Sequence, residues 1–531
     1  MNLRLRCLMP LLVLALALSA PARAHEGDAQ TGPLGKVSFP TSCDPKVQPA
    51  FERAVAMLHS FWYSASENTF REVLKDDPQC AIATWGVASI LMSNALAGQG
   101  ASPKGAVDAQ AAIDEGRRIG AKTERERDYL EAVAAYYKDF ATRPEKERQV
   151  SRAKAYEALA QRYPADDEAQ IFFALYNAGT QTQADQTYAA YLKSAAILEE
   201  QFKKHPDHPG VAHYLIHSYD APPLADKGLV AARRYATIAP AAPHALHMPS
   251  HIFTRVGSWQ ESASTNARSN DVAKAGGDID EAYHASDYMV YAYLQLARDT
   301  EARKAMDAAL KVEGMSPRFT GRYASAAMPA RYAMERGAWQ EAAKLQPIGS
   351  TYPFVESLTY FARCIGAARS GDLESARKDA DRLEAQHKAL LVAKNTYWAT
   401  EVEIQRLAAA GWIALGEGKQ EEALKFMRAA ADLEDRNEKH IVTPGRIVPA
   451  RELLGEMLLE LKQPQAALKE FEASQLREPN RFRNYLGSAR AAEKAGDSAK
   501  AAAYYRKLLA LAKDGDGTRP EIASAKKLAL R

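Results

Sequence analysis

Apolar residues recur at every third or fourth position through most of the chain, from about Gln48 to Leu530. This period predicts amphipathic helices, each of which buries one face. Alternating Val, Ile and Thr bounded by hairpin turns, which would indicate strands, is absent from the sequence. The pattern therefore predicts an all-α fold.

A repeat of 34 residues organises the C-terminal part of this pattern. Aligning Ala467 with Ala501 also aligns Phe471 with Tyr505, and Pro479 closes one unit. Upstream, a glycine followed by an acidic or amide residue recurs, as the end of one helix and the start of the next require, at Gly257, Gly337, Gly371 and Gly418. Small and aromatic residues at this period resemble tetratricopeptide (TPR) repeats. The resemblance implies a TPR-type α-solenoid, a right-handed superhelix of about a dozen antiparallel helix pairs.

The N-terminus has the features of a secretory signal peptide. Arg4 and Arg6 precede an apolar run from Leu8 to about Ala20, and Ala22-Arg23-Ala24 forms a small-residue cleavage site. We expect cleavage after Ala24 and an exported, periplasmic protein. No later apolar stretch reaches the length of about 18 residues that a membrane span needs.

Composition and repeat quality divide the chain into segments. These are the signal peptide (1–24), a flexible polar segment (25–42), divergent TPR-like helix pairs (43–203), histidine-rich helix pairs (204–297), central helix pairs (298–433), a loop (434–448), and C-terminal repeats with a capping helix (449–531). The loop contains Pro444 and Gly445, so we expect it on one rim of the array.

Charge and cysteine content narrow the function classes. The formal net charge of +3 falls to about zero in the mature chain, because three arginines and no acidic residue leave with the signal peptide. A neutral chain has no basic field for nucleic acid or an anionic membrane. Cys43, Cys80 and Cys364 remain in a compartment that favours disulfides. Cys43 and Cys80 either form a disulfide that clamps the first helix pairs or stay as buried thiols.

Two His-x-x-x-His pairs stand one repeat apart. His213 and His217 are followed, at an offset of 34 residues, by His247 and His251. Residues four apart lie on one helix face, and neighbouring helices pack about 8–10 Å apart. The repeat phase places all four on the helix faces that line the concave groove in TPR arrays, so their imidazoles are expected to converge. Such a set would suit Zn, Cu or Ni.

An internal match shows that the repeat does not need these histidines. Residues 247–262 match residues 327–342 at an offset of 80, with Pro249 on Pro329, but His247 becomes Ala327 and His251 becomes Arg331. Pro249 removes a backbone donor and is expected to kink its helix or start it.

Further residues at equivalent positions are candidates for the same groove. They are His284, Asp287, Tyr291, Arg331, Trp412, Glu452 and Glu456. His284 or Asp287 would assist a metal site, and Asp220 or Asp287 would orient a ligating histidine from outside. His205, His208 and His244 are interpreted as loop or helix-start residues.

The segments "HPDHPGVAHYLIHSYD" and "HALHMPSHIFTRVGSW" also resemble a group of exported bacterial TPR-repeat proteins. The wider TPR resemblance implies a scaffold that binds a partner protein or peptide in its concave groove. The alternative is a periplasmic protein that binds a transition-metal ion through the four histidines. Nucleophile-elbow, phosphate-loop and H-E-x-x-H motifs are missing from the sequence, so we do not expect an enzyme.

Overall fold

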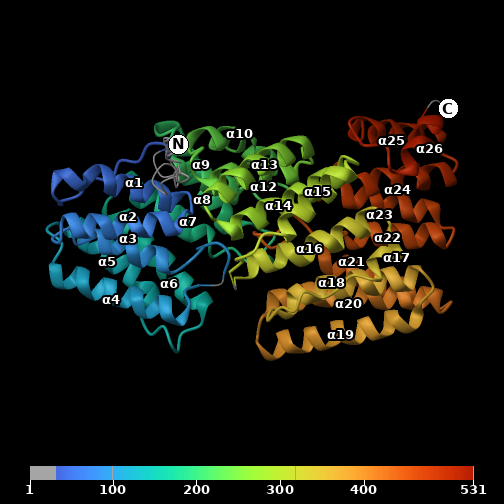
Figure 1. Cartoon of the computed structure of the whole chain (residues 1–531), viewed down its shortest axis with the longest axis horizontal. Coiled ribbons are helices and arrows are strands. Elements are labelled where there is room, and N and C mark those ends of the chain that lie inside the picture. The colour runs from blue at the N-terminus through green and yellow to red at the C-terminus, as the bar shows by residue number, and fades with distance from the viewer. Residues whose placement is uncertain (1–31, 99, 317, 530–531) are drawn as a thin grey trace, which may run out of the picture.

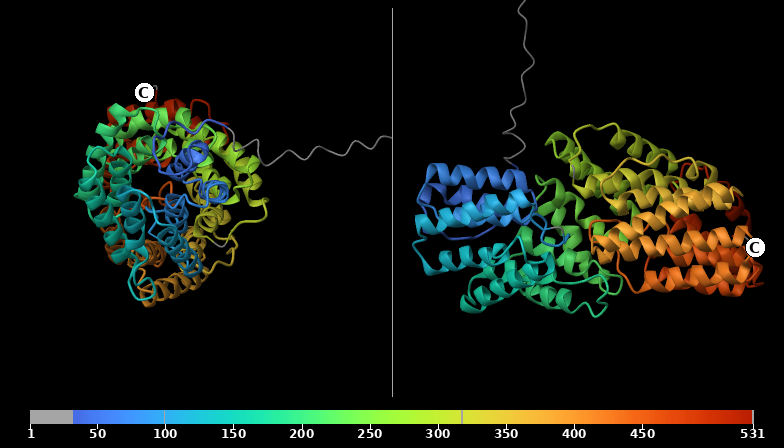
Figure 2. Two further views of the ribbon diagram at one scale, coloured as in Figure 1. Left: turned by 90° about the vertical axis from the view of Figure 1, so that its left-hand side faces the viewer. Right: turned by 90° about the horizontal axis from the view of Figure 1, so that it is seen from below.

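The protein is an all-α solenoid. The computed structural model describes residues 32–98, 100–316 and 318–529, and every regular element within these ranges is helical. Helices follow one another along the long axis in Figure 1 and wind into a rounded superhelix when viewed end-on in Figure 2. The expected all-α solenoid is confirmed. No helix in the described ranges is long and apolar enough to cross a membrane.

The helices of the N-terminal part run through residue 255. They are α1 (Gln48–His59), α2 (Tyr63–Asp76), α3 (Ile82–Leu91), α4 (Pro103–Ile119), α5 (Glu124–Tyr137), α6 (Glu145–Arg162), α7 (Asp167–Ala178), α8 (Ala189–Lys204), α9 (Pro209–Ser218), α10 (Leu229–Ile238), α11 (Pro243–His247) and α12 (Pro249–Arg255), with short 3-10 turns at Pro45–Val47 and Ala225–Gly228.

The helices of the C-terminal part continue the array. They are α13 (Trp259–Ala275), α14 (Ile279–Gln295), α15 (Asp299–Leu310), α16 (Phe319–Glu335), α17 (Trp339–Ala342), α18 (Pro353–Arg369), α19 (Leu373–Val392), α20 (Thr396–Gly416), α21 (Gln420–Asp435), α22 (Ala450–Glu460), α23 (Pro464–Gln475), α24 (Phe482–Lys494), α25 (Ser498–Leu511) and α26 (Pro520–Leu528).

Small residues at the repeat positions let the helices approach closely. The ring of Phe471 on α23 lies against Gly455 of α22 and Gly487 of α24, where an added Cβ would come within 2.7 and 2.3 Å of the ring. Gly257 and Gly337, expected to end helices, have φ of 70° and 65°, the left-handed conformation that glycine adopts without strain. The repeat pattern thus corresponds to real contacts and turns.

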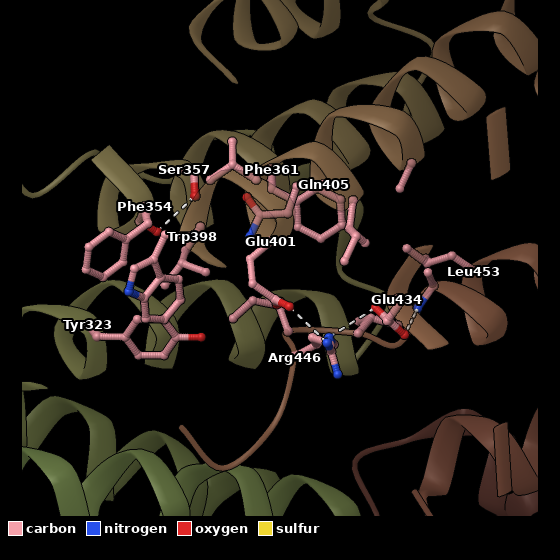
Figure 3. A pocket seen from close by; sticks show the side chains of 17 residues that line it. Tyr323, Phe354, Ser357, Phe361, Trp398, Glu401, Gln405, Glu434, Arg446 and Leu453 are labelled. Carbon is pink, nitrogen blue, oxygen red and sulfur yellow. Dashed lines mark hydrogen bonds and ion pairs between the residues drawn. The ribbon is translucent and has the colours of Figure 1, made fainter. Parts of the chain in front are cut away.

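The loop between α21 and α22, residues 436–449, lies inside the superhelix. The expected position on a rim is wrong, because residues 437–445 are all buried. Arg331 of α16 donates to the carbonyl oxygens of Gly445 (3.2 Å) and Arg446 (2.7 Å). Figure 3 shows Arg446 between Glu401 of α20 and Glu434 of α21, and burial raises the pKa of Glu434 to about 8. We call residues 436–449 the interior loop.

The N-terminal segment differs from the expectation of flexibility. Residues 25–31 lie outside the described ranges, but Phe39 is fully buried and its ring packs against Phe51, Trp85 and Tyr129 at centroid distances of 4.9–5.3 Å. Residues 32–42 are held because Phe39 fills an aromatic cluster between α1, α3 and α5. The predicted signal peptide, 1–24, also lies outside the described ranges.

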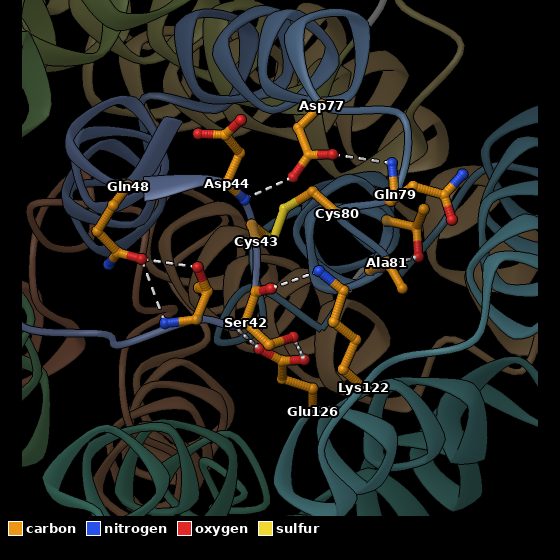
Figure 4. Close-up of a disulfide and its surroundings, with 12 residues drawn as sticks. Ser42, Cys43, Asp44, Gln48, Asp77, Gln79, Cys80, Ala81, Lys122 and Glu126 are labelled. Atoms are coloured by element: carbon orange, nitrogen blue, oxygen red, sulfur yellow. Dashed lines mark hydrogen bonds between the residues drawn. A yellow bond between two sulfur atoms is a disulfide. The ribbon is translucent and has the colours of Figure 1, made fainter. Parts of the chain in front are cut away.

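A disulfide fixes the chain ahead of α1 to the start of α3. Cys43 and Cys80 are bonded, with their Cα atoms 4.8 Å apart, and Figure 4 shows the bond beside the hydrogen bond from the Asp44 backbone N–H to the Asp77 carboxylate. Cys364 is a buried free thiol. Of the two alternatives for Cys43 and Cys80, the structure contains the disulfide.

Buried ion pairs join helices that are distant in the sequence. Arg481, just before α24, is fully buried and bonds Glu335 at the end of α16 and Glu452 of α22, each at 2.7 Å. It also contacts the hydroxyl of Tyr291 on α14. These four side chains connect the middle of the array to its C-terminal repeats.

Replacing Arg481 tests how much these buried ion pairs contribute to the stability of the fold. We expect R481M to lower the free energy of unfolding by about 3–5 kcal/mol, because Glu335 and Glu452 would be left as unpaired buried charges. Urea denaturation monitored by circular dichroism measures the change. K378M breaks the exposed pair between Lys378 and Glu374 and should leave the midpoint unchanged. An R481M midpoint equal to that of K378M would contradict the prediction.

Candidate metal centre

Six histidines from four helices form one buried cluster. α9 supplies His213 and His217, α11 supplies His244 and His247, α12 supplies His251, and α14 supplies His284. Pro249 ends the helical run at Met248 and starts α12, whereas its counterpart Pro329 lies within the continuous α16. The expected break at Pro249 is therefore present, and it gives α12 its own direction beside α9.

The first group consists of His213, His217 and His244, whose ligand atoms lie within 4.8 Å of one another. The Nε2 atoms of His213 and His217 are 3.1 Å apart. His213 Nδ1 donates to the carbonyl oxygen of His59 at 2.7 Å, so its Nε2 carries a lone pair. His244 Nδ1 lies 3.2 Å from the carboxylate of Glu281.

The second group consists of His247, His251 and His284, again with ligand atoms within 4.8 Å of one another. His247 and His251 place their Nε2 atoms 3.0 Å apart. The ring of His284 lies 4.1 Å from that of His247, centroid to centroid. The hydroxyl of Tyr288 is 3.3 Å from His251 Nε2.

The tautomers of His247 and His251 are fixed by their outer partners. The side-chain amide of Asn266 donates to the Ser262 carbonyl and therefore presents its oxygen to His247 Nδ1, at 2.7 Å. His251 Nδ1 faces the Asp220 carboxylate at 2.9 Å. Because oxygens accept from both Nδ1–H groups, two Nε2 lone pairs face each other at 3.0 Å. That contact is repulsive unless both nitrogens bind one cation, and the Tyr288 hydroxyl, 3.3 Å from His251 Nε2, can relieve it on one side only.

Burial keeps these imidazoles neutral. Desolvation lowers the pKa of His213, His217 and His247 well below the usual value of 6.5, that of His251 to about 4 and that of His284 to about 3. A proton is therefore a poor candidate for the shared cation at neutral pH. Neutral imidazole is the form that coordinates a metal ion.

Asp220 links the cluster to the interior loop. Its carboxylate accepts from Arg255 Nε at 2.7 Å and from Lys439 Nζ of the loop at 3.0 Å, besides His251. Burial alone would raise the pKa of Asp220, but Lys439 and Arg255 hold it below its usual range. The carboxylate is thus ionised and accepts a hydrogen bond from His251 Nδ1, which orients that ring.

A cleft of about 1260 Å³ adjoins the first group. Phe61 and Asp278 line this cleft. The ring of Phe61 also lies 4.4 Å from that of His213 and stacks on that of His244 at 5.6 Å. Burial raises the pKa of Asp278 to about 6. Phe61 therefore contacts the first group and also lines the cleft.

Not every expected groove residue joins the cluster. Asp287, expected as a helper of the metal site, instead pairs with Arg331 at 3.5 Å. Trp412 and Glu452 are buried, at 2% and 0% exposure, and Glu456 pairs with Arg369 and Arg483. Buried packing and ion pairs engage these side chains in the structure. Tyr291 contacts Arg481.

His244 is the cluster member that sequence reasoning missed. It was interpreted as a helix-start residue, and it does stand in the first turn of α11. The signal available was its spacing, three residues before His247, which places both on one helix face. His59 and His208 form a different arrangement, in which each Nε2 lies 2.9 Å from the Glu168 carboxylate and both histidines are satisfied.

Comparisons with known proteins identify no family. No protein-family model matches the sequence, and no curated protein matches it. Among solved structures it is similar to the APC/C hetero-tetramer Cut9–Hcn1 (12% identity, 92% of this chain and 96% of that chain, TM-score 0.29). Others are the human IFIT1 dimer with m7Gppp-AAAA (11%, 77% and 87%, 0.35) and yeast Tom70 (13%, 91% and 88%, 0.30). These likenesses are too weak to indicate a ligand or partner.

The buried neutral state of His251 predicts a pH dependence of stability in the metal-free protein. Above pH 6.5 the imidazole is neutral in both the folded and the unfolded chain. Below pH 6.5 it becomes protonated in the unfolded chain, whereas in the folded chain its pKa is about 4 and it stays neutral until the pH approaches that value. Stability from this residue is therefore lost as pH falls. Relative to wild type, H251Q should gain about 3 kcal/mol between pH 7 and pH 4.

Urea titrations across that pH range measure the difference. H387Q, at a position on α19 outside the cluster, is the matched variant against which the H251Q difference is compared. A stability difference between H251Q and wild type that stays constant from pH 7 to pH 4 would contradict the prediction.

Proposed function

We propose that this protein binds a transition-metal ion through its buried histidine cluster. The observation that carries the proposal is the 3.0 Å approach of two Nε2 lone pairs, on His247 and His251, with both Nδ1 atoms engaged by oxygens. A metal ion turns that repulsive contact into a shared coordination sphere.

The spacing of the nitrogens supports a late first-row ion. Imidazole nitrogens bind Zn²⁺ at 2.0–2.1 Å, so two ligands of one ion lie about 3.3 Å apart at a tetrahedral angle and about 2.9 Å apart at a right angle. The values of 3.0 and 3.1 Å lie within this range. An all-imidazole set favours Zn, Cu or Ni over Mg or Ca.

Export to the periplasm is part of the same proposal. The signal-peptide pattern of residues 1–24 supports it, and so does the Cys43–Cys80 disulfide, since disulfides persist in oxidising compartments. A protein there would meet metal ions outside the cytosolic pool.

Metal analysis of the purified protein tests the proposal. Without an affinity tag of histidines, we expect at least one equivalent of Zn, Cu or Ni per chain by plasma mass spectrometry. The double variant H217A/H251A should lose it, because each substitution removes one member of a close Nε2 pair. H205A/H387A, outside the cluster, should retain full metal content. Wild-type protein that neither carries nor takes up these metals would refute metal binding.

A second candidate function is the capture of an extended peptide inside the superhelix. The interior loop supports this second function, because the loop itself is a chain segment whose backbone is bound by other parts of the protein. The Glu438 N–H donates to the Gln183 carbonyl oxygen at 2.9 Å, and Arg331 donates to two carbonyl oxygens of the loop. Main-chain bonds of this kind bind extended segments of varied sequence. A partner peptide would compete with the loop.

A loop-replacement variant tests this second function. In this variant a Gly-Ser spacer of equal length replaces residues 438–445. We expect a synthetic peptide of residues 436–449 to bind to the variant, and isothermal calorimetry measures the binding. Wild type should bind it far more weakly, because its tethered loop competes at high effective concentration. A peptide with K439E and R446E is the matched control. No binding to a variant shown to be folded would rule the second function out.

A further inference from the structure

The arrangement of the six histidines points to two ions, and we infer a two-ion centre. His213, His217 and His244 hold one ion, and His247, His251 and His284 hold the second. This inference rests on the proposed metal-binding function and deepens it by assigning the number of ions and the ligands of each.

One ion cannot use the whole cluster. Zinc sites take four protein ligands or three with an open position, whereas six imidazoles gather here. They divide into two sets of three, each with its ligand atoms within 4.8 Å of one another. Between the sets, the ring centroids of His217 and His251 are 5.5 Å apart and those of His244 and His247 are 5.7 Å apart. The two sets are adjacent, and it is the distances between ligand atoms that divide them.

Each set has its own outer support. The first is oriented by the His59 carbonyl and the Glu281 carboxylate; the second by Asn266 and Asp220. Outer partners that fix the ring and its tautomer are the usual companions of a ligating histidine. Each of these four outer partners hydrogen-bonds a histidine of one set.

Buried nitrogens without partners lie in the first set. Among the described residues, His217 Nδ1 and His244 Nε2 are buried and have no hydrogen-bond partner. Leaving a buried polar atom unpaired costs about 1–3 kcal/mol. Coordination of an ion by His244 Nε2 would use that nitrogen's free lone pair, independently of the lone-pair contact that marks the second set.

The two ions should differ in accessibility. In the first set, the side chain of His244 is 13% exposed, and Phe61, which contacts His213 and His244, lines the cleft. In the second set, all three histidines are buried. Three protein ligands leave each ion a position for water or a small anion. The first ion should therefore exchange quickly with a chelator and the second slowly.

Stoichiometry and exchange test the inference. Metal-free protein loaded with Zn²⁺ and freed of excess metal should hold two ions per chain and release them to a colorimetric chelator in two phases. H244A should hold one ion and lose the fast phase, and H284A should hold one and lose the slow phase. H205A should keep both phases. Circular dichroism and urea midpoints establish that each variant is folded.

A measurement on wild type alone keeps the test independent of the variants. Cu²⁺-loaded wild type should show magnetic coupling between neighbouring ions in electron paramagnetic resonance at two equivalents, and an uncoupled signal when first loaded with less than one. Two coupled ions support the inference. One ion per chain at saturation overturns it and leaves the proposed function standing, whereas no bound ion overturns both. Loss of both ions from folded H244A or H284A overturns the assignment of separate sets.

Discussion

The interior of this protein depends on the neutralisation of one buried carboxylate, Asp220. An unpaired carboxylate at 6% exposure would cost several kcal/mol. Arg255 of α12 and Lys439 of the interior loop pair with it, and His251 donates to it. The end of α9, the direction of α12 and the path of the loop are therefore one arrangement. Displacing any of them leaves a charge unpaired beside the histidine cluster.

The interior loop changes the usual mechanics of a repeat array. In a solenoid each repeat contacts its neighbours, and stability is a sum of local terms. Here Lys439 reaches Asp220 across 219 residues and Arg446 reaches Glu401 across 45. Arg481 adds a third long connection, to Glu335 across 146 residues. Such contacts resist flexing of the superhelix, so the six histidines are held by a frame stiffer than stacked helix pairs alone.

Sequence reasoning predicted the features that local periodicity determines. The repeat phase placed His213, His217, His247 and His251 together because helix spacing and repeat length set their positions. The repeat pattern could not predict that residues 436–449 lie inside the superhelix, because the pairing of Lys439 with Asp220 joins two segments that are not related by the repeat. It also assigned Glu452 to a ligand groove, because a helix register shows which face a charge occupies but not that Arg481 buries it. His244 was missed because its place in the first turn of the five-residue α11 outweighed its spacing of three residues from His247.

The internal match between residues 247–262 and 327–342 sets His251, a proposed metal ligand, beside Arg331 at the same repeat position. His251 and Arg331 occupy equivalent positions, yet Arg331 pairs with Asp287 and donates to the loop carbonyls of Gly445 and Arg446. His251 approaches the same loop indirectly, through Asp220 and Lys439. Both positions thus secure the interior loop, one with a permanent charge and one with a neutral imidazole. Only the imidazole leaves a lone pair with which it could coordinate the proposed metal ion.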